Sequence, residues 1–210
     1  MLCYWGLIGV VRSLLCRRFQ LIMPITKRCD QPTGFEINMS EQHIFLVGPM
    51  GVGKTTVGKQ LAGLLHRPFI DVDAEIESRC GADIQWIFDM EGEKGFRERE
   101  SKVLREIISS SPSSVIATGG GVVLSAQNRQ ILKSNGQVIY LSAPKEQLNE
   151  RMRRDKSRPL LQVEDREKVI NKLLEERDPL YREVADVVFS AEGGSASRVA
   201  KVLLDELSKH

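Results

Sequence analysis

A glycine-rich segment between an apolar run and a helical pattern constrains this chain more than any other feature. Residues 48–55 read Gly-Pro-Met-Gly-Val-Gly-Lys-Thr and follow the apolar run at 44–47. From Val57 onward, apolar residues recur at the spacing of one helix face. Strand, G-x-x-x-x-G-K-[ST] and helix, in that order, are the context of a phosphate-binding P-loop; the alternative is a chance glycine-rich turn. The sequence therefore predicts a nucleoside triphosphate site at the start of this helix.

Each residue type in the segment has a part in holding phosphate. Glycines let successive backbone N–H groups turn toward phosphate oxygens, and the start of the helix adds its positive dipole end. Lys54 supplies a point charge to the outer phosphates, and the Thr55 hydroxyl is a ligand for Mg²⁺. The triphosphate is expected to contact Gly51, Val52, Gly53, Lys54, Thr55 and Thr56.

Short apolar runs alternate with amphipathic stretches from His43 onward, which is typical of a parallel α/β sheet. Helix starts are marked by Asp83, Ser125, Asp165 and Ser195. We predict strands at 43–47, 68–72, 114–118, 137–141 and 186–190, and helices at 53–66, 74–80, 84–90, 94–109, 125–134, 145–152, 166–184 and 196–208.

Composition narrows the class of protein. The 210 residues carry a formal net charge of only +2, which gives no reason to expect nucleic acid as a partner. Three of the four cysteines lie in the first 38 residues and there is no C-x-x-C pair, so neither a disulfide framework nor a metal cluster is indicated. We expect a cytoplasmic protein in a reduced compartment, without a membrane partner and monomeric.

Residues 1–38 differ from the rest of the chain. They hold five Lys or Arg against two acids, and their apolar run from Leu2 to Val11 is too short to span a membrane. Charges follow this run instead of preceding it, unlike a signal peptide, and Met39 begins a sequence that reads like an ordinary protein start. We interpret 1–38 as an extension that is disordered or a misassigned start, and 39–210 as one domain that contains the P-loop; a targeting peptide or surface anchor is the alternative.

Two carboxylates close the second predicted strand, at Asp71 and Asp73. Residues two apart in a strand share a face, and ligands of open α/β sheets gather where strands end. Asp71 is therefore a candidate for holding Mg²⁺ through water, and Asp73 for meeting a hydroxyl that is about to be phosphorylated. The alternative for Asp73 is a helix cap ahead of residues 74–76.

Charged residues fall on the apolar faces of two predicted helices. Arg177 lies on the apolar stripe of 166–184, and Glu100 lies on that of 94–109 with Arg97 at its margin, one turn away. Buried charges are costly unless paired, and an Arg97–Glu100 pair would orient the Arg97 guanidinium. Arg177 has no such partner on its own face. Either it makes an internal salt bridge with Asp71, Asp73 or Glu100, or it holds a substrate anion with bidentate geometry.

Two further signals are weak when taken alone. Gly119, Gly120 and Gly121 follow the third strand, where they either bring backbone N–H groups close to a ligand or form a plain turn. Arg158 lies in a basic loop at 153–159, where it either stabilises charge on a transferring phosphoryl group or is simply solvated.

In combination these residues resemble the shikimate kinase family over essentially all of 39–210. The resemblance is carried by six segments: Gly48–Thr55, Asp71–Asp73, Phe96–Glu100, Gly119–Gly121, Arg158–Leu161 and Glu176–Tyr181. It implies a P-loop NTPase fold with a five-stranded parallel sheet flanked by helices, a shikimate-binding helical region and a mobile lid loop. The implied reaction is ATP- and Mg²⁺-dependent phosphorylation of the shikimate 3-hydroxyl, a step toward chorismate and the aromatic amino acids.

The resemblance also implies roles for individual residues. Asp73 would position the shikimate hydroxyls, Arg97 and Arg177 would grip the carboxylate, and the Gly120 backbone would donate to it. Phe88 and Phe96 would form walls of that pocket. Arg158 would be the lid arginine, and Arg151 would lie against adenine. Residues 1–38 have no counterpart in the family pattern, and the loop 190–194 gives no clear match.

Three other functions are weighed against this one. A kinase of the same architecture acting on gluconate shares the P-loop but not the set Asp73, Arg97, Arg177 and the three glycines. A regulatory nucleotide-binding module without catalysis is expected to have lost Lys54, Asp73 or Arg158. A signalling GTPase is disfavoured because Asn171-Lys172 is not followed by the guanine-reading Asp.

Overall fold

The structure, a computed structural model, describes residues 42–154, 166–192 and 194–208. The predicted extension at 1–38, the helix-start residue Asp165 and the lid residue Arg158 lie outside the described residues. Every other predicted element and site residue lies within them.

In the described part of the chain, five parallel strands form one sheet in the order β2-β3-β1-β4-β5, as predicted for a P-loop NTPase fold. The central strand β1 pairs with β3 on one side and with β4 on the other. The strands are β1 His43–Val47, β2 Phe69–Asp71, β3 Val115–Ala117, β4 Gly136–Ser142 and β5 Val187–Ser190.

The helices follow the predicted pattern with boundaries shifted by one or two residues. The side chains of Asp83, Ser125 and Ser195 each accept a hydrogen bond from a backbone N–H in the first turn of the helix that follows, which confirms the predicted caps. The elements are α1 Lys54–Leu65, α2 Val72–Cys80, α3 Ile84–Ser110, the 3₁₀ turn η1 Val122–Leu124, α4 Ala126–Asn135, α5 Lys145–Arg154, α6 Arg166–Val184 and α7 Ala196–Leu207.

The two helices predicted at 84–90 and 94–109 are joined almost without a gap in α3. Gly92 interrupts the run with φ 68° and ψ 180°, a backbone conformation that favours glycine. The predicted break is therefore present, but a single residue makes it. Ile87 before this residue and Phe96 and Leu104 after it belong to the same core cluster.

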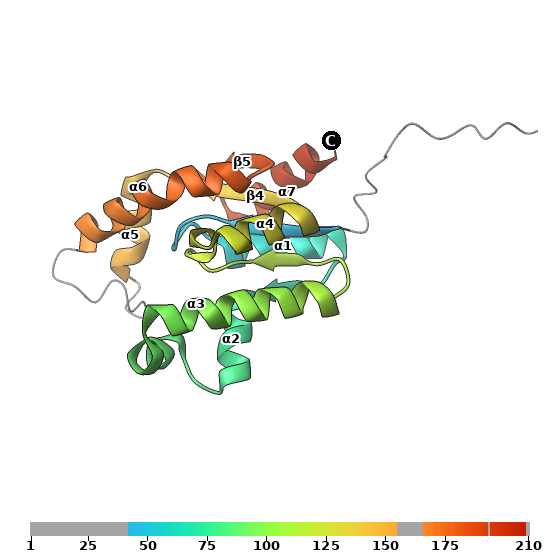
Figure 1. Ribbon diagram of the computed structural model, residues 1–210. Coiled ribbons are helices and arrows are strands. Elements are labelled where there is room, and N and C mark those ends of the chain that lie inside the picture. Colours follow the sequence, from blue (N-terminus) through green and yellow to red (C-terminus); the bar gives the residue numbers. More distant parts are fainter. Residues whose placement is uncertain (1–41, 155–165, 193, 209–210) are drawn as a thin grey trace, which may run out of the picture. The chain divides into compact units, whose positions relative to one another are not determined.

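Alternating side chains of β1 build a core on each face of the sheet. Ile44 and Leu46 join a cluster with α1 and α7, while Phe45 and Val47 join one with α2, α3 and α4. Phe45 and Leu46 are fully buried, and burial of such side chains stabilises the fold by about 1.5–3 kcal/mol each. In Figure 1, α2 and α3 lie side by side, and α6 lies by β4 and β5.

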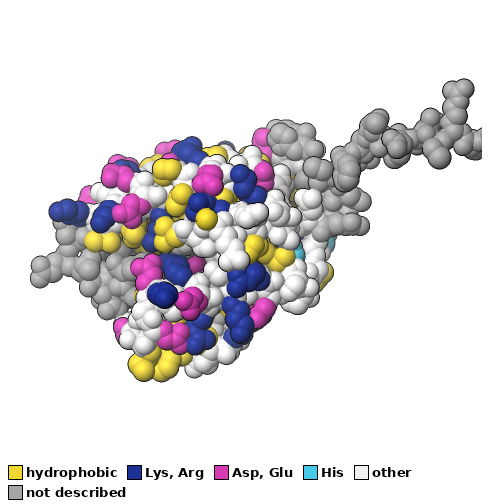
Figure 2. Space-filling model, viewed as in Figure 1, with side chains coloured by type: hydrophobic (Ala, Val, Ile, Leu, Met, Phe, Trp, Pro, Cys, Tyr) yellow, Lys and Arg dark blue, Asp and Glu magenta, His cyan; other side chains and the backbone are white. Residues whose placement is uncertain are grey.

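Among the described residues, no helix is both long and apolar enough to cross a bilayer. Figure 2 shows Lys and Arg mixed with Asp and Glu over the face in view, with no basic patch set apart from acidic side chains.

Candidate active site

The loop between β1 and α1 depends on glycine at two positions. Gly48 has φ 141°, and a side chain there would collide with the Leu141 carbonyl oxygen on the neighbouring strand. Gly53 has φ 106° and caps α1 without any side-chain hydrogen bond. Because no side chain satisfies the first N–H groups of α1, they remain available to an anion. The buried Lys54 ammonium donates to the carbonyls of Gly48 (2.7 Å) and Pro49 (2.9 Å), which holds it against the loop.

Thr55 and Asp71 bring together, beside the loop, two oxygen atoms of the kind that bind a metal ion. The Thr55 hydroxyl donates to Asp71 Oδ2 at 2.7 Å, and Asp71 Oδ1 accepts from the N–H groups of Asp73 (3.1 Å) and Ala74 (3.4 Å). Mg²⁺ in phosphate sites takes one or two protein oxygens together with phosphate oxygens and waters. The chemistry of this pair therefore fits the predicted metal site.

Asp71 and Asp73 are arranged differently from the prediction. Strand β2 ends at Asp71, which is the N-cap of α2, and Asp73 lies in the first turn of that helix. The expectation that the two share a strand face is therefore wrong, and so is the alternative that Asp73 is the cap. Both side chains nevertheless line one cavity, because the helix turn brings Asp73 back over the end of the sheet.

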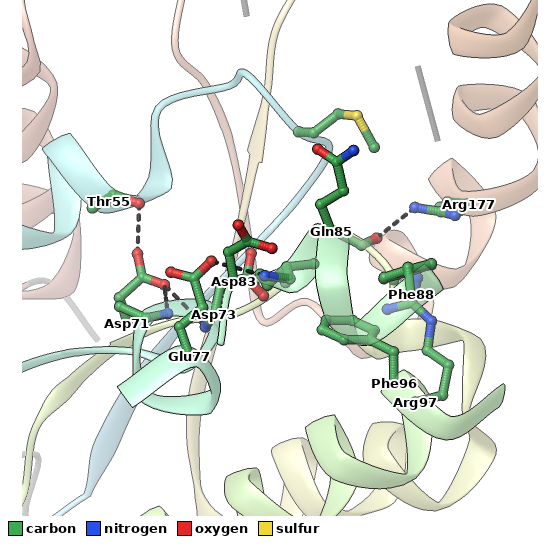
Figure 3. Close-up of a pocket in the computed structure, with 16 residues that line it drawn as sticks. Thr55, Asp71, Asp73, Glu77, Asp83, Gln85, Phe88, Phe96, Arg97 and Arg177 are labelled. Carbon is green, nitrogen blue, oxygen red and sulfur yellow. Dashed lines mark hydrogen bonds between the residues drawn. The ribbon is translucent and has the colours of Figure 1, made fainter. Parts of the chain in front are cut away.

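This cavity has a volume of about 380 Å³ and lies at the carboxyl ends of β1, β2 and β3. Figure 3 shows Thr55 and Asp71 on one side of it and Arg97, Arg177 and the two phenylalanines on the other. The Phe88 and Phe96 rings pack with their centroids 4.7 Å apart. The lining also includes residues that the sequence analysis did not name as candidates for the acceptor site: Met50, Ala74, Glu77, Asp83, Ile84 and Gln85.

Arg97 is held in place by carboxylates, as predicted. Its Nη1 lies 2.9 Å from Glu100 Oε2, and its Nη2 lies 3.1 Å from Glu93 Oε1. Burial alone would lower the pKa of Arg97, but the carboxylates of Glu100 and Glu93 raise it, so the guanidinium stays charged. Burial raises the pKa of Glu100, and Arg97 opposes that shift. Arg97 therefore enters the cavity as an oriented cation.

Arg177 is a buried charged group at the cavity that lacks an ion-pair partner among the described residues. It is 5% exposed, its Nη1 donates to the Gly120 carbonyl at 3.2 Å, and its Nε has no hydrogen-bond acceptor. It forms no ion pair with any residue that the structure describes, so the salt-bridge alternative with Asp71, Asp73 or Glu100 is not seen. In Figure 3 its guanidinium points from α6 toward the glycine segment. A buried guanidinium with open donors is a site for an anion.

The three glycines after β3 are explained by side chains of the site that lie against them. A methyl group on Gly119 would lie 2.8 Å from Asp73 Oδ1 and closer still to Glu100 Oε1. One on Gly121 would overlap the Arg97 guanidinium. Glycine here lets Asp73 and Arg97 pack directly on the backbone, which the sequence did not reveal.

A second cavity of about 280 Å³ lies on the other side of the P-loop. Arg151 borders it and donates from Nη1 to the carbonyls of Gly51 (3.2 Å) and Val52 (3.0 Å). The sequence placed Arg151 at the nucleotide but left out the loop after β5. The structure adds Ala191, Gly194, Ala196 and Val199 to this lining; the glycines of that loop were the signal that could have pointed to it.

Fold and site together define a P-loop kinase that acts on a small molecule, with a triphosphate loop beside an acceptor cavity containing two arginines and an aspartate. A family model described as shikimate kinase matches residues 50–208. The chain belongs to the shikimate kinase family.

Individual relatives agree with this assignment. The shikimate kinase of Francisella tularensis subsp. novicida (strain U112) is 50% identical over 158 residues, which are 75% of this chain and 90% of that protein. The structure of shikimate kinase from Acinetobacter baumannii in complex with shikimate is 50% identical, with a TM-score of 0.78 over 81% of this chain and 95% of that one. A gluconokinase from Sinorhizobium meliloti 1021 is 18% identical with a TM-score of 0.52, over 81% and 95% of the two chains, and shares the fold alone.

Proposed function

We propose that this protein transfers the γ-phosphoryl group of ATP to the 3-hydroxyl of shikimate, giving shikimate 3-phosphate on the route to chorismate and the aromatic amino acids. The observation that carries the proposal is the buried Arg177, whose Nε has no hydrogen-bond acceptor and which has no ion-pair partner among the described residues, at the same cavity as Arg97. Two arginines suit one carboxylate, and the remaining cavity suits a small ring with hydroxyl groups.

On the acceptor side, each polar group has a distinct task. Arg97 and Arg177 hold the carboxylate from two helices, which fixes the orientation of the ring. Asp73 lies at the Thr55 side of the cavity, where it orients the 3-hydroxyl and accepts its proton. The Gly120 backbone completes the carboxylate site. Phosphoryl transfer requires little covalent help, so this positioning supplies most of the catalysis.

On the nucleotide side, Gly51–Thr56 cradle the phosphates, and Arg151 lies against the adenine ring, which occupies the second cavity. Thr55 and Asp71 would hold Mg²⁺, which neutralises phosphate charge when it is bound. Lys54 would leave its carbonyl partners to meet the outer phosphates, and Arg158 would close over the transferred group. Removal of divalent ions with EDTA should therefore abolish turnover, and added Mg²⁺ should restore it.

We also propose that the active protein is a cytoplasmic monomer whose kinase domain is residues 39–210. Helices α1 to α7 of that segment pack with its sheet into two hydrophobic cores. Light scattering measures the mass in solution; a dimer as the smallest active species would contradict this.

The reaction is tested by measuring ADP release with shikimate, with gluconate and without acceptor. We expect turnover with shikimate to exceed the other two by at least about 100-fold, since a site whose buried polar groups are left unpaired by the wrong acceptor discriminates by about 10⁴-fold or more. Gluconate, which also carries a carboxylate and hydroxyls, is the matched control. ADP release that does not depend on shikimate, or that is faster with gluconate, would sink the proposal.

A further inference from the structure

One carbonyl oxygen of the glycine segment is held by two side chains of the same helix. Gly120 O accepts from Arg177 Nη1 at 3.2 Å and also from the Tyr181 hydroxyl. Arg177 and Tyr181 are four residues apart in α6, so they lie on one helix face. The helix that carries the carboxylate-binding arginine therefore also fixes the segment that faces it.

The Tyr181 ring itself is clamped. It is fully buried and stacks on the Tyr140 ring of β4, with centroids 5.0 Å apart and planes at 26°. The Tyr140 hydroxyl donates to Asp178 Oδ1 at 2.7 Å, and Asp178 Oδ2 accepts from Arg182 Nε at 2.7 Å. Burial raises the pKa of Tyr181, so its hydroxyl remains a donor at any working pH. Its hydroxyl is thus a fixed, permanently protonated donor.

The hydrogen bond from the Tyr181 hydroxyl to Gly120 O affects anion binding by the Arg177 guanidinium. A buried carbonyl needs a donor, and without Tyr181 the only described donor to Gly120 O would be Arg177. With Tyr181 in place, that carbonyl keeps a donor when the guanidinium binds an anion. We propose that Tyr181 is a positioning residue for shikimate: its hydroxyl holds the Gly120 carbonyl and so orients the Gly119–Gly121 segment and Arg177 toward the substrate carboxylate. This inference rests on the proposed function.

The chain offers a matched pair of variants that tests it. Tyr181→Phe removes the hydroxyl that donates to Gly120, and Tyr140→Phe removes the hydroxyl of the stacked, buried ring, which donates to Asp178 instead. We expect Tyr181→Phe to raise KM for shikimate about threefold to tenfold, the range of one net hydrogen bond, with KM for ATP unchanged. Tyr140→Phe should keep the KM values for shikimate and ATP, and it should lose about as much thermal stability as Tyr181→Phe does.

Other outcomes are distinguishable. Wild-type protein without shikimate-dependent turnover would overturn the proposed function itself. Active wild type with equal KM shifts in both variants, or with none in Tyr181→Phe, would overturn only the role of Tyr181.

A spectroscopic readout does not depend on how Tyr181→Phe folds. The chain has three tyrosines, so protein grown with 3-fluorotyrosine gives three ¹⁹F resonances. The variants Tyr4→Phe and Tyr140→Phe assign two of them and leave Tyr181. Shikimate should shift the Tyr181 resonance more than that of Tyr140; a Tyr181 resonance that does not move at saturating shikimate would refute the inference.

Discussion

Replacing Arg177 by methionine separates substrate binding from fold stability. The change keeps an unbranched side chain but removes the guanidinium, which lies buried and donates to the Gly120 carbonyl. A charged hydrogen bond to a carboxylate contributes about 1.5–3 kcal/mol, and Arg97 remains to hold the substrate. We therefore expect a loss of about 3 kcal/mol of shikimate binding, or roughly 100-fold in affinity.

The free energy of unfolding should change far less than it would if Arg177 made a buried salt bridge. Breaking a buried ion pair costs about 3–5 kcal/mol because it strands the partner charge. Arg177 has no ion-pair partner among the described residues, so Arg177→Met should change the free energy of unfolding by less than about 1 kcal/mol.

Titration calorimetry measures the affinities for shikimate and for ATP, and urea unfolding measures the free energy of unfolding. Lys172→Met is the matched control, since it removes the same charge from an exposed position on the same helix. It should leave both affinities unchanged. Loss of shikimate and ATP binding together with several kcal/mol of stability would refute the reasoning and assign Arg177 a structural role.

Three further predictions concern a glycine of the site, the pH dependence of stability and the N-terminal segment. Gly121→Ala should displace Arg97 and raise KM for shikimate at least about tenfold, with KM for ATP unchanged. Gly63→Ala is the control: it lies at an exposed helix position with open space around it and should stabilise the protein slightly. An unchanged KM for shikimate in Gly121→Ala would contradict the packing argument. Burial lowers the pKa of His43 in the folded state, so as pH falls below about 6.5 the unfolded chain binds a proton that the folded chain resists, and stability falls; urea unfolding at pH 7.5 and 5.5 should show this loss in wild type and a smaller loss in His43→Asn. A chain beginning at Met39 should keep full kcat and KM in the same assay, and reduced activity would assign a role to residues 1–38.

The sheet was predictable because its signals are local. Each strand is a short apolar run, each break carries a capping or turn residue, and the P-loop fixes which strand precedes α1. The joined helix α3 was harder to foresee. Gly92 alone breaks the helical backbone, so the break does not require a turn motif of several residues.

Pairwise features of the site followed from helical spacing, whereas contacts between elements did not. Arg97 and Glu100 are one turn apart, so their ion pair could be foreseen. The role of Asp71 as the N-cap of α2 could not be foreseen. The D-x-D pattern is the same whether the strand ends at Asp71 or continues to Asp73. The reason for glycine at 119 and 121 depends on side chains that reach the segment from α2 and α3.

The central claim is that the protein phosphorylates the 3-hydroxyl of shikimate, and the identity of the product tests it most directly. The measurement is a ³¹P–¹H correlation spectrum of the reaction mixture after incubation with ATP, Mg²⁺ and shikimate. The account predicts a new phosphate monoester coupled to the proton on carbon 3 of the ring. A phosphorus coupled to another ring position, or ATP consumed with only inorganic phosphate formed, would contradict it.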